Sequence, residues 1–390
     1  MDLQIKDLKK LNYTYYFSRF NWLAGCIPSV FLIWQRDGLE FSKIIYLQGL
    51  FGLMIIILEF PSGILADRFS RKSILFFATV NIALGSLTYS FAHGFNQFLF
   101  AEFLFAIGFA FTSGSDTALV WDSYVSVGKE NNAKHILAKG NSFMAGSAIL
   151  LTILGGILMN FVLTLPLLIT SGMYLTLAFM YLTVKEPERV KQKETKLIWI
   201  HTLSKLKLPY IWAIICFVMI NNIVLRIVFW GYIPKLQSIN VDQIWFGFVL
   251  AGANFIMLIV SLYYQKNTDP SNKIISLFLM LTGIGVILFV FELNLMILLL
   301  AIMFHQCGRA TIRYLSMVKI NENVSSDIRA SAISMIMSVN SILYWLVATL
   351  INHFDLELKD VMILQSGIVI LIFILIPILG KNKFQEVSID

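Results

Sequence analysis

Residues 63–72 read GILADRFSRK and separate two long apolar segments of the chain. Gly63 ends the first segment, four charged side chains follow between Asp67 and Lys72, and residues 73–92 carry no charge. A short, mainly basic loop between two apolar segments is typical of a membrane protein, on the cytoplasmic side of the bilayer.

The composition of the whole chain is that of a membrane protein. Of its 390 residues, 58% are hydrophobic and 14% are charged, with a mean hydropathy of +0.77; soluble domains have about 45–50% apolar and about 25% charged residues. Because about 20 apolar residues span a bilayer as a helix, we predict an all-α membrane protein with twelve transmembrane helices. The predicted helices are residues 13–34, 42–66, 73–92, 97–119, 136–160, 164–184, 209–233, 242–265, 272–291, 294–318, 328–351 and 360–379. A β-barrel would need shorter segments of alternating hydrophobicity.

The basic residues lie mainly on one side of the predicted helices. With the N-terminus placed inside, 22 of the 30 Lys and Arg residues fall in inner segments and four in outer segments. The positive-inside rule therefore predicts a multi-pass protein of the plasma (inner) membrane with both termini in the cytoplasm. This distribution accounts for the net charge of +7 without a nucleic-acid partner.

One loop is longer than the others and divides the chain. Residues 185–208 hold seven Lys or Arg and three Glu. We predict an N-terminal six-helix bundle (1–184), a cytoplasmic linker (185–208) and a C-terminal six-helix bundle (209–390).

The pattern G-x-L-A-D-R-x-x-R-K at 63–72 resembles the loop between helices 2 and 3 of the major facilitator superfamily of secondary transporters, with Ser70 where that family usually has glycine. The stretches EFPSG at 59–63, SGSDTALVWDS at 113–123 and RAS at 329–331 resemble a bacterial branch of this superfamily, mostly multidrug efflux transporters. The resemblance implies two pseudo-symmetric six-helix bundles that rock around a central cavity, in a protein that works as a monomer.

The resemblance also implies a gating role for the charged loop, in which Asp67 faces a helix end of the other half and latches one state. We assign Gly63, Asp67, Arg68 and Arg71 to this gating loop. Asp122 is predicted to pair with Arg68 or Arg71. The alternative is a simple positive-inside anchor, although an anchor requires neither Gly63 nor Asp67.

Several charged side chains lie within the predicted helices, where a charge is costly unless it faces a cavity or a partner. They are the acids Glu59, Glu102 and Asp116 and the bases Arg19, Arg226, Arg309 and Arg313. Spacings of three and four residues place Glu102 and Asp116 on one stripe of the predicted helix 97–119. Both acids are candidate proton carriers, because burial disfavours the charged form of a carboxyl group. Alternatively, they form gate ion pairs with bases of helix 1 or helix 10.

The resemblance places helices 1, 4, 7 and 10 around the central cavity, and these helices carry most of the polar candidates. On helix 10, His305, Arg309 and Arg313 are four residues apart and share one face. Aromatic and polar groups together suit an amphipathic organic ligand. The substrate-cavity candidates are Arg19, Trp22, Asn222, Arg226, His305, Arg309 and Arg313. For His305, and for the stripe that contains Arg19 and Trp22, ordinary interhelical packing is the alternative.

These features predict a secondary active transporter that works by alternating access. The chain has no G-x-x-x-x-G-K-[ST] nucleotide loop, so the proton gradient is the predicted energy source. The preferred function is proton-coupled export of a small amphipathic compound. The alternatives are transport of an anionic metabolite by the intramembrane arginines, export of a lipid or peptide, and a receptor or assembly factor that has kept the fold. We predict no enzymatic activity, no cofactor and no metal; the expected partners are protons, a small-molecule substrate and the bilayer.

Overall fold

The computed structural model describes residues 5–20, 22–187, 209–267, 270–291, 294–316 and 329–368, and none of these is in a strand. The first half contains α1 (Ile5–Ser18), the 3-10 helix η1 (Trp22–Cys26), α2 (Ile27–Arg36), α3 (Phe41–Arg68), α4 (Arg71–Phe91), α5 (Gly94–Thr112), α6 (Ser115–Val125), α7 (Glu130–Leu158) and α8 (Leu165–Thr183). The second half contains α10 (Pro209–Trp230), α11 (Tyr232–Ser238), α12 (Ile244–Lys266), α13 (Asn272–Leu288), α14 (Leu295–Tyr314), α16 (Arg329–His353) and a helical segment at 358–368.

The lengths of these helices agree with a polytopic membrane protein. Within the described ranges, nine helices are long and apolar enough to cross a membrane, and α13 is a shorter apolar helix. The predicted first span is divided into α1, η1 and α2, and the predicted twelfth is described as far as residue 368. Each of the twelve predicted spans thus corresponds to helical structure.

Three helices that the sequence analysis predicted to be continuous are broken. They are residues 13–34, 97–119 and 209–233. Pro28 at the start of α2 has no N–H for the carbonyl four residues earlier, and η1 lies between α1 and α2. Gly114 has a φ of +74°, a conformation that favours glycine, and separates α5 from α6. Pro234, in the first turn of α11, likewise cannot bond to the carbonyl of Trp230, where α10 ends.

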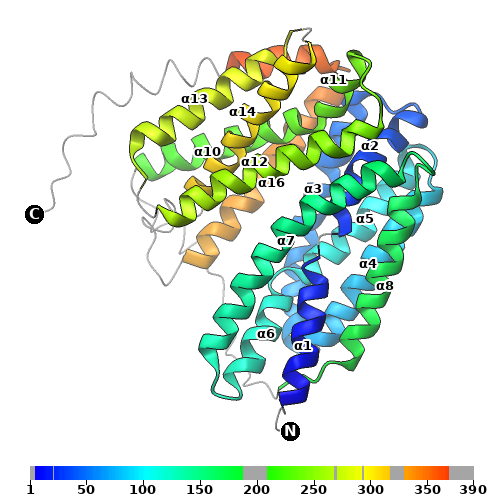
Figure 1. Ribbon diagram of the computed structural model, residues 1–390, viewed down its shortest axis with the longest axis vertical. Helices are drawn as coiled ribbons and strands as arrows, with labels where there is room; N and C mark the ends of the chain where they lie inside the picture. The colour runs from blue at the N-terminus through cyan, green and yellow to red at the C-terminus, as the bar shows by residue number, and fades with distance from the viewer. Residues whose placement is uncertain are drawn as a thin grey trace, which may run out of the picture.

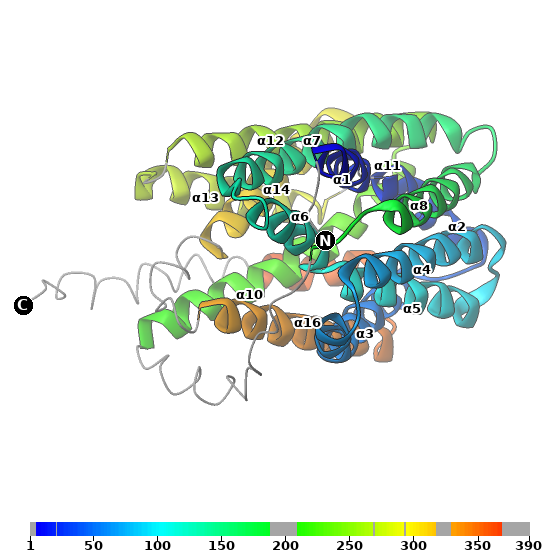
Figure 2. The same cartoon turned by 90° about the horizontal axis from the view of Figure 1, so that it is seen from below.

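Each half of the chain forms its own helical bundle (Figure 1). In the first half, α4 packs against α5 and α8, and α3 packs against α5; in the second half, α14 packs against α13 and α12. Two helix pairs join the halves, α3 with α16 and α7 with α12. Figure 2 shows both pairs side by side from a second direction.

The α7–α12 crossing is close because two glycines meet there. A Cβ atom at Gly156 would lie 2.6 Å from the Cα of Gly247, closer than real Cβ atoms approach a neighbour. Small residues allow helices to approach in this way in membranes. The approach also brings the Asn254 amide within 3.5 Å of the Thr152 hydroxyl, across the two halves.

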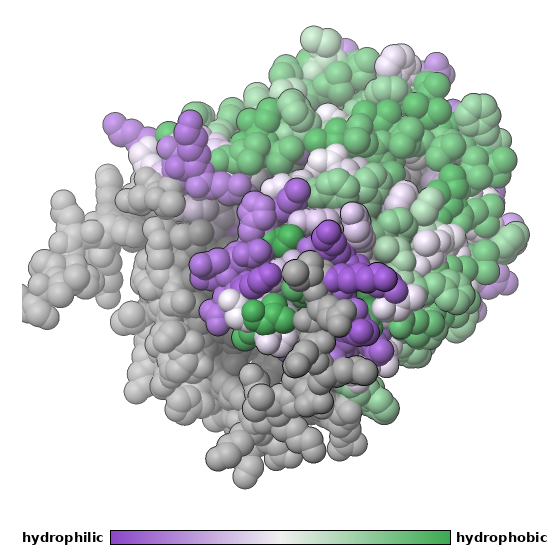
Figure 3. Space-filling model, turned by 60° about the horizontal axis from the view of Figure 1, so that its bottom comes forward, coloured by the Kyte–Doolittle hydropathy of each residue, from purple (hydrophilic) through white to green (hydrophobic). Residues whose placement is uncertain are grey.

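The halves meet differently on the two membrane sides. We call the side at which α1 begins the N-terminal side, and the side at which α2 ends the far side. On the far side, Gln35 and Gln237 exchange two hydrogen bonds of 3.0 and 2.9 Å, and Ser42 donates to Asp355 at 2.8 Å. Toward the N-terminal side the helices of the two halves diverge (Figure 1). Figure 3 shows hydrophilic side chains gathered on that side, beside a hydrophobic flank.

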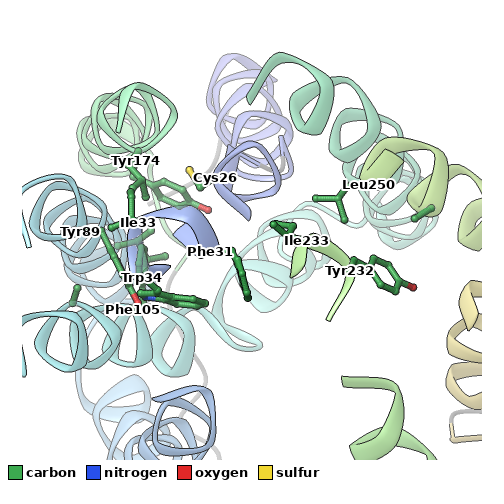
Figure 4. Close-up of a cluster of buried hydrophobic side chains, with 14 of the residues drawn as sticks. Cys26, Phe31, Ile33, Trp34, Tyr89, Phe105, Tyr174, Tyr232, Ile233 and Leu250 are labelled. Atoms are coloured by element: carbon green, nitrogen blue, oxygen red, sulfur yellow. The ribbon is translucent and has the colours of Figure 1, made fainter. Parts of the chain in front are cut away.

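Buried aromatic side chains reinforce the closure of the far side. Trp34 is fully buried, and its ring centre lies 5.2 Å from that of Trp230 in the second half and 6.3 Å from that of Tyr89 in the first. In Figure 4, Trp34, Tyr89 and Phe105 lie together, with Tyr232 of the second half across the cluster. Burying a large apolar side chain stabilises a fold by about 1.5–3 kcal/mol, so these contacts favour the closed far side.

Asp37 fastens the first far-side loop to the loop between α4 and α5. Its carboxylate accepts hydrogen bonds of 2.9 Å from Arg36 Nε and from the backbone N–H of Gly94, and lies 3.1 Å from His93 Nδ1. Burial opposes ionisation of this carboxyl group. The two hydrogen bonds and the positive charges of Arg36 and His93 outweigh burial, and the pKa of Asp37 is lowered.

We expect Asp37→Asn to lower the melting temperature of the detergent-purified protein at neutral pH but not in strong acid. A carboxyl group whose pKa is lowered on folding adds stability above its unfolded pKa of about 3.9. That contribution is lost as the pH falls through the folded pKa. Thermal unfolding of both proteins over a pH series is the measurement. Equal melting temperatures at neutral pH would contradict the expectation.

The glycine crossing gives a second prediction. Gly156→Val should destabilise the protein by about 1–3 kcal/mol, the usual effect of overpacking. Gly146→Val is the matched control, because Gly146 lies on the same helix and an added Cβ there would meet nothing within 4 Å. Thermal unfolding of the two variants should therefore differ. If both lose the same stability, the α7–α12 contact is not the cause.

Candidate functional site

Glu102 on α5 is a buried acid whose hydrogen-bond donors among the described residues are uncharged. It is 5% exposed, and its Oε1 accepts hydrogen bonds of 2.6 Å from Gln48 Nε2 on α3 and from the Tyr89 hydroxyl on α4. Within the described part of the chain, no base lies at ion-pair distance from Glu102. Both donors are neutral and use the same oxygen, so this carboxyl group can gain or lose a proton without breaking an ion pair.

Asp116 lies in a different setting, because the break at Gly114 places it at the start of α6. Its Oδ2 is 2.5 Å from a guanidinium nitrogen of Arg19, which follows α1. Its Oδ1 accepts from the backbone N–H of Thr117 at 2.6 Å. The predicted single stripe of Glu102 and Asp116 is therefore wrong, since the two acids belong to different helices. Asp116 instead makes the ion pair with helix 1 that was the alternative.

The aromatic Tyr15 ring packs on this ion pair, and further aromatic side chains pack together next to Arg19 in the sequence. The Arg19 guanidinium lies 4.9 Å from the centre of the Tyr15 ring, and Trp22 packs at 5.5 Å from Phe17 and 4.7 Å from Phe20. Among the described residues, neither Arg19 Nε nor Trp22 Nε1 has a hydrogen-bond partner, although both atoms are buried. The first half thus presents a neutralised charge pair within an aromatic setting.

Arg226 on α10 crosses from the second half toward the first. Its guanidinium lies 4.2 Å from the centre of the Tyr344 ring and donates to the backbone carbonyl of Gln48 on α3 at 3.4 Å. Asn222 lies one turn earlier on α10 and is half-buried. Arg226 therefore contacts the same residue that holds Glu102.

Arg309 on α14 is a second guanidinium on an aromatic face. It lies 4.7 Å from the centre of the Phe229 ring and is half-buried. The positive charges of Arg313 and Arg226 both act on it, and Arg313 is exposed. In the described ranges, none of these three arginines has an ion-pair partner. The second half thus concentrates positive charge without a counter-ion from these residues.

His305 does not share a ligand-accessible face with Arg309 and Arg313, which corrects the prediction for helix 10. It is fully buried, its Nε2 lies 3.1 Å from the carbonyl oxygen of Leu225, and its Nδ1 contacts the Tyr232 hydroxyl. Because a carbonyl can only accept, Nε2 carries the hydrogen and Nδ1 accepts from Tyr232. Both ring nitrogens are thus occupied in this structure, which agrees with the packing role that was the alternative.

The charged loop of the sequence analysis lies at the end of α3 and the start of α4. Arg71 forms an ion pair of 2.5 Å with Asp122 at the end of α6. The carboxylate of Glu186, which follows α8, accepts from the backbone N–H groups of Arg71 and Lys72 at 2.9 and 3.2 Å. The side chains of two predicted gating residues, Asp67 and Arg68, and the surroundings of a third, Gly63, lie outside the described part of the structure.

Sequence analysis missed the two donors that hold Glu102, Gln48 and Tyr89. Both lie in apolar predicted helices and carry no charge that would stand out there. A glutamine in such a segment is itself a signal, because its amide needs a partner inside the membrane.

The sequence model of the Major Facilitator Superfamily matches residues 17–349. The chain belongs to the Major Facilitator Superfamily. It is a multi-pass membrane transporter rather than an enzyme, and the predicted fold of twelve helices in two six-helix bundles is confirmed. No curated protein matches the sequence.

Solved structures of this fold resemble the protein at low sequence identity. The nucleoside transporter NupG has a TM-score of 0.75 at 14% identity, with 97% of this chain and 100% of that chain covered. A transporter of the POT family in complex with a thioalcohol-conjugated peptide has a TM-score of 0.70 at 12% identity, with 97% of both chains covered. A bacterial homologue of the human lysosomal transporter Spinster, inward-facing and unoccupied, has a TM-score of 0.66 at 17% identity, with 87% and 79% covered. These likenesses show the fold alone.

The Arg19–Asp116 pair predicts a larger loss of stability when a buried ion pair is broken than when an exposed pair is broken. Asp116→Asn or Arg19→Gln should each destabilise the protein by about 3–5 kcal/mol, the usual cost of leaving one charge of a buried pair alone. The exposed pair of Lys43 with Glu40 is the control, and Lys43→Gln should cost less than about 1 kcal/mol. Thermal unfolding of the three variants decides. Equal, small effects would show that Asp116 does not depend on Arg19.

Proposed function

We propose that this transporter carries a small amphipathic organic anion together with a proton. The observation that supports the anion is the pair Arg226 and Arg309, two half-buried guanidiniums for which the described residues supply no carboxylate. A charge in the membrane interior needs a partner, and a carboxylate or phosphate of a substrate would supply it. The guanidinium group of arginine is also well suited to bidentate hydrogen bonding with a carboxylate or phosphate.

The amphipathic character rests on the aromatic rings. Tyr344 covers one face of Arg226, and Phe229 covers one face of Arg309. Such stacking holds a guanidinium in place while its edge remains able to donate hydrogen bonds. An organic anion with an apolar body would find both kinds of contact between the halves.

Proton coupling rests on Glu102, the buried acid held by two neutral donors. Asp116 is the weaker candidate, because its charge is already balanced by Arg19. An anion at Arg226 cancels a positive charge near Glu102, and this favours a proton on the carboxyl group. Substrate and proton then bind together, as in a symporter. In this proposal the N-terminal side is the cytoplasmic side of the plasma membrane and the protein is a monomer.

The second candidate is proton-driven export of an amphipathic compound, as in multidrug efflux. It is supported by the resemblance of residues 59–63 and 113–123 to that branch and by the aromatic setting of Arg19 and Trp22. The two candidates share the same fold and the same acid. They differ in the sign of the response to a proton gradient.

The test is transport by the purified protein in proteoliposomes with an imposed pH gradient. The panel contains aromatic and aliphatic carboxylates, phosphate esters and their neutral analogues. We expect accumulation of an anion on the side to which protons flow; depletion from that side would favour export, and movement of neutral analogues alone would contradict the anion site. Arg226→Gln and Arg309→Gln should each raise KM by roughly tenfold to a hundredfold, the effect of one lost charge-assisted hydrogen bond. Lys266→Gln, an exposed residue at the end of α12, is the control.

A further inference from the structure

We infer that Gln48 is a positioning residue that couples proton binding at Glu102 to the position of Arg226, and thereby to the rocking of the two halves. The inference rests on the proposed proton-coupled transport and assigns the coupling to one uncharged residue. Gln48 is 5% exposed and lies on α3, one of the two helices of the first half that pack against the second half.

Gln48 contacts both groups with different atoms. Its side-chain Nε2 donates to Glu102 at 2.6 Å, within the first half. Its backbone carbonyl accepts from Arg226 of the second half at 3.4 Å. A single residue thus lies between an acid of one half and a base of the other.

The surface of α3 is shaped to receive the guanidinium. Gly52 lies one turn after Gln48, and a Cβ atom there would already be 3.5 Å from one terminal nitrogen of Arg226 and 3.9 Å from the other. A longer side chain at this position would occupy the space that the guanidinium uses. On its other side, Arg226 is covered by the Tyr344 ring.

The two contacts of Gln48 respond differently when the halves move. The bond to Glu102 and the bond from Tyr89 to Glu102 both lie within the first half and persist in a rigid-body rotation. The bond between Arg226 and the Gln48 carbonyl joins the halves, as do the Gln35–Gln237 bonds. Opening the far side therefore separates Arg226 from Gln48 but leaves Glu102 in place.

Electrostatic interaction then links proton binding at Glu102 to the movement of Arg226. The charged and titratable groups that face Glu102 from the elements packed against it, among the described residues, are Tyr89 on α4 and Arg226 on α10; α3 contributes the neutral Gln48. Charges interact strongly where water is excluded, so the approach or withdrawal of Arg226 changes the balance between charged and neutral Glu102. Gln48 separates the two charges, with its side-chain amide on Glu102 and its backbone carbonyl on Arg226, so that no direct ion pair locks the halves together.

The experiment compares Gln48→Leu with Glu102→Gln and with a matched control, Gln365→Leu. Gln365 is also a buried glutamine, 4% exposed, and its amide has no hydrogen-bond partner among the described residues. The first readout needs no substrate: the melting temperature of each purified protein from acidic to mildly alkaline pH. We expect Glu102→Gln to lose part of the wild-type pH profile. Gln48→Leu should move that same part to a different pH, because Glu102 keeps its proton site but loses one of its two donors, and Gln365→Leu should keep the wild-type profile.

The second readout uses an anion that the wild type transports. Gln48→Leu should retain exchange of substrate across the membrane without a gradient. It should lose proton-driven accumulation by roughly tenfold or more, as expected when one hydrogen bond to a charged group is removed. A purely structural role would reduce exchange and accumulation in proportion.

The outcomes separate this inference from the proposed function. A wild-type pH profile in Gln48→Leu, or a proportional loss of exchange and accumulation, overturns the role of Gln48. If no anion moves with the wild type, the proposed function fails, and the substrate-free melting profiles still decide whether Gln48 and Glu102 act together. If Gln48→Leu does not fold, Gln48→Glu replaces it; this near-isosteric change places a second carboxyl group beside Glu102 and must alter the pH profile, and an unchanged profile overturns the inference.

Discussion

The cost of leaving a charge unpaired within the membrane is the constraint on which the rest of this structure depends. Three arrangements among the described residues reduce this cost. Asp116 and Arg19 neutralise each other at 2.5 Å, Glu102 is held by neutral donors, and the guanidiniums of Arg226 and Arg309 lie on aromatic rings. The first solution is complete, because a buried pair with one partner removed is strongly destabilised. In the other two arrangements, Glu102 can still bind a proton, and Arg226 and Arg309 can still bind an anion. We distinguish functional charges from structural ones on this basis.

The sequence predicts the membrane spans of this fold better than it predicts the breaks within its helices. Twelve spans are predictable because length and hydrophobicity alone decide whether a segment can cross a bilayer. Helix breaks are not predictable in the same way. Pro28 and Pro234 lie at breaks, yet Pro61 lies inside α3, which continues to Arg68. Whether a proline ends a helix depends on what the neighbouring helices supply to the freed carbonyl group, and that is tertiary information.

In the candidate site, too, the sequence predicts some features and not others. The charged residues are visible in the sequence, because a charge stands out in an apolar segment. Their partners are not: Glu102 and Gln48 are 54 residues apart, and Arg226 and Gln48 are 178 apart. The predicted stripe of Glu102 and Asp116 was wrong because the left-handed Gly114 interrupts the helix between them. Which acid is paired and which is free is therefore decided by packing.

The distribution of interactions between the halves explains how such a structure can change state. Every ion pair among the described residues joins two positions of the first half, including those between Arg71 and Asp122 and between Lys185 and Asp7. The polar contacts that join the halves on the far side are amide and hydroxyl hydrogen bonds, and they lie beside aromatic and aliphatic packing. A hydrogen bond of this kind contributes about 0.5–1.5 kcal/mol, and its groups can bond to water once they separate. The buried pair of Arg19 with Asp116 thus lies wholly within the first half, while the polar contacts at the boundary can break and re-form at small cost. A boundary of ion pairs would resist this motion, because opening it would leave charges without partners on both surfaces.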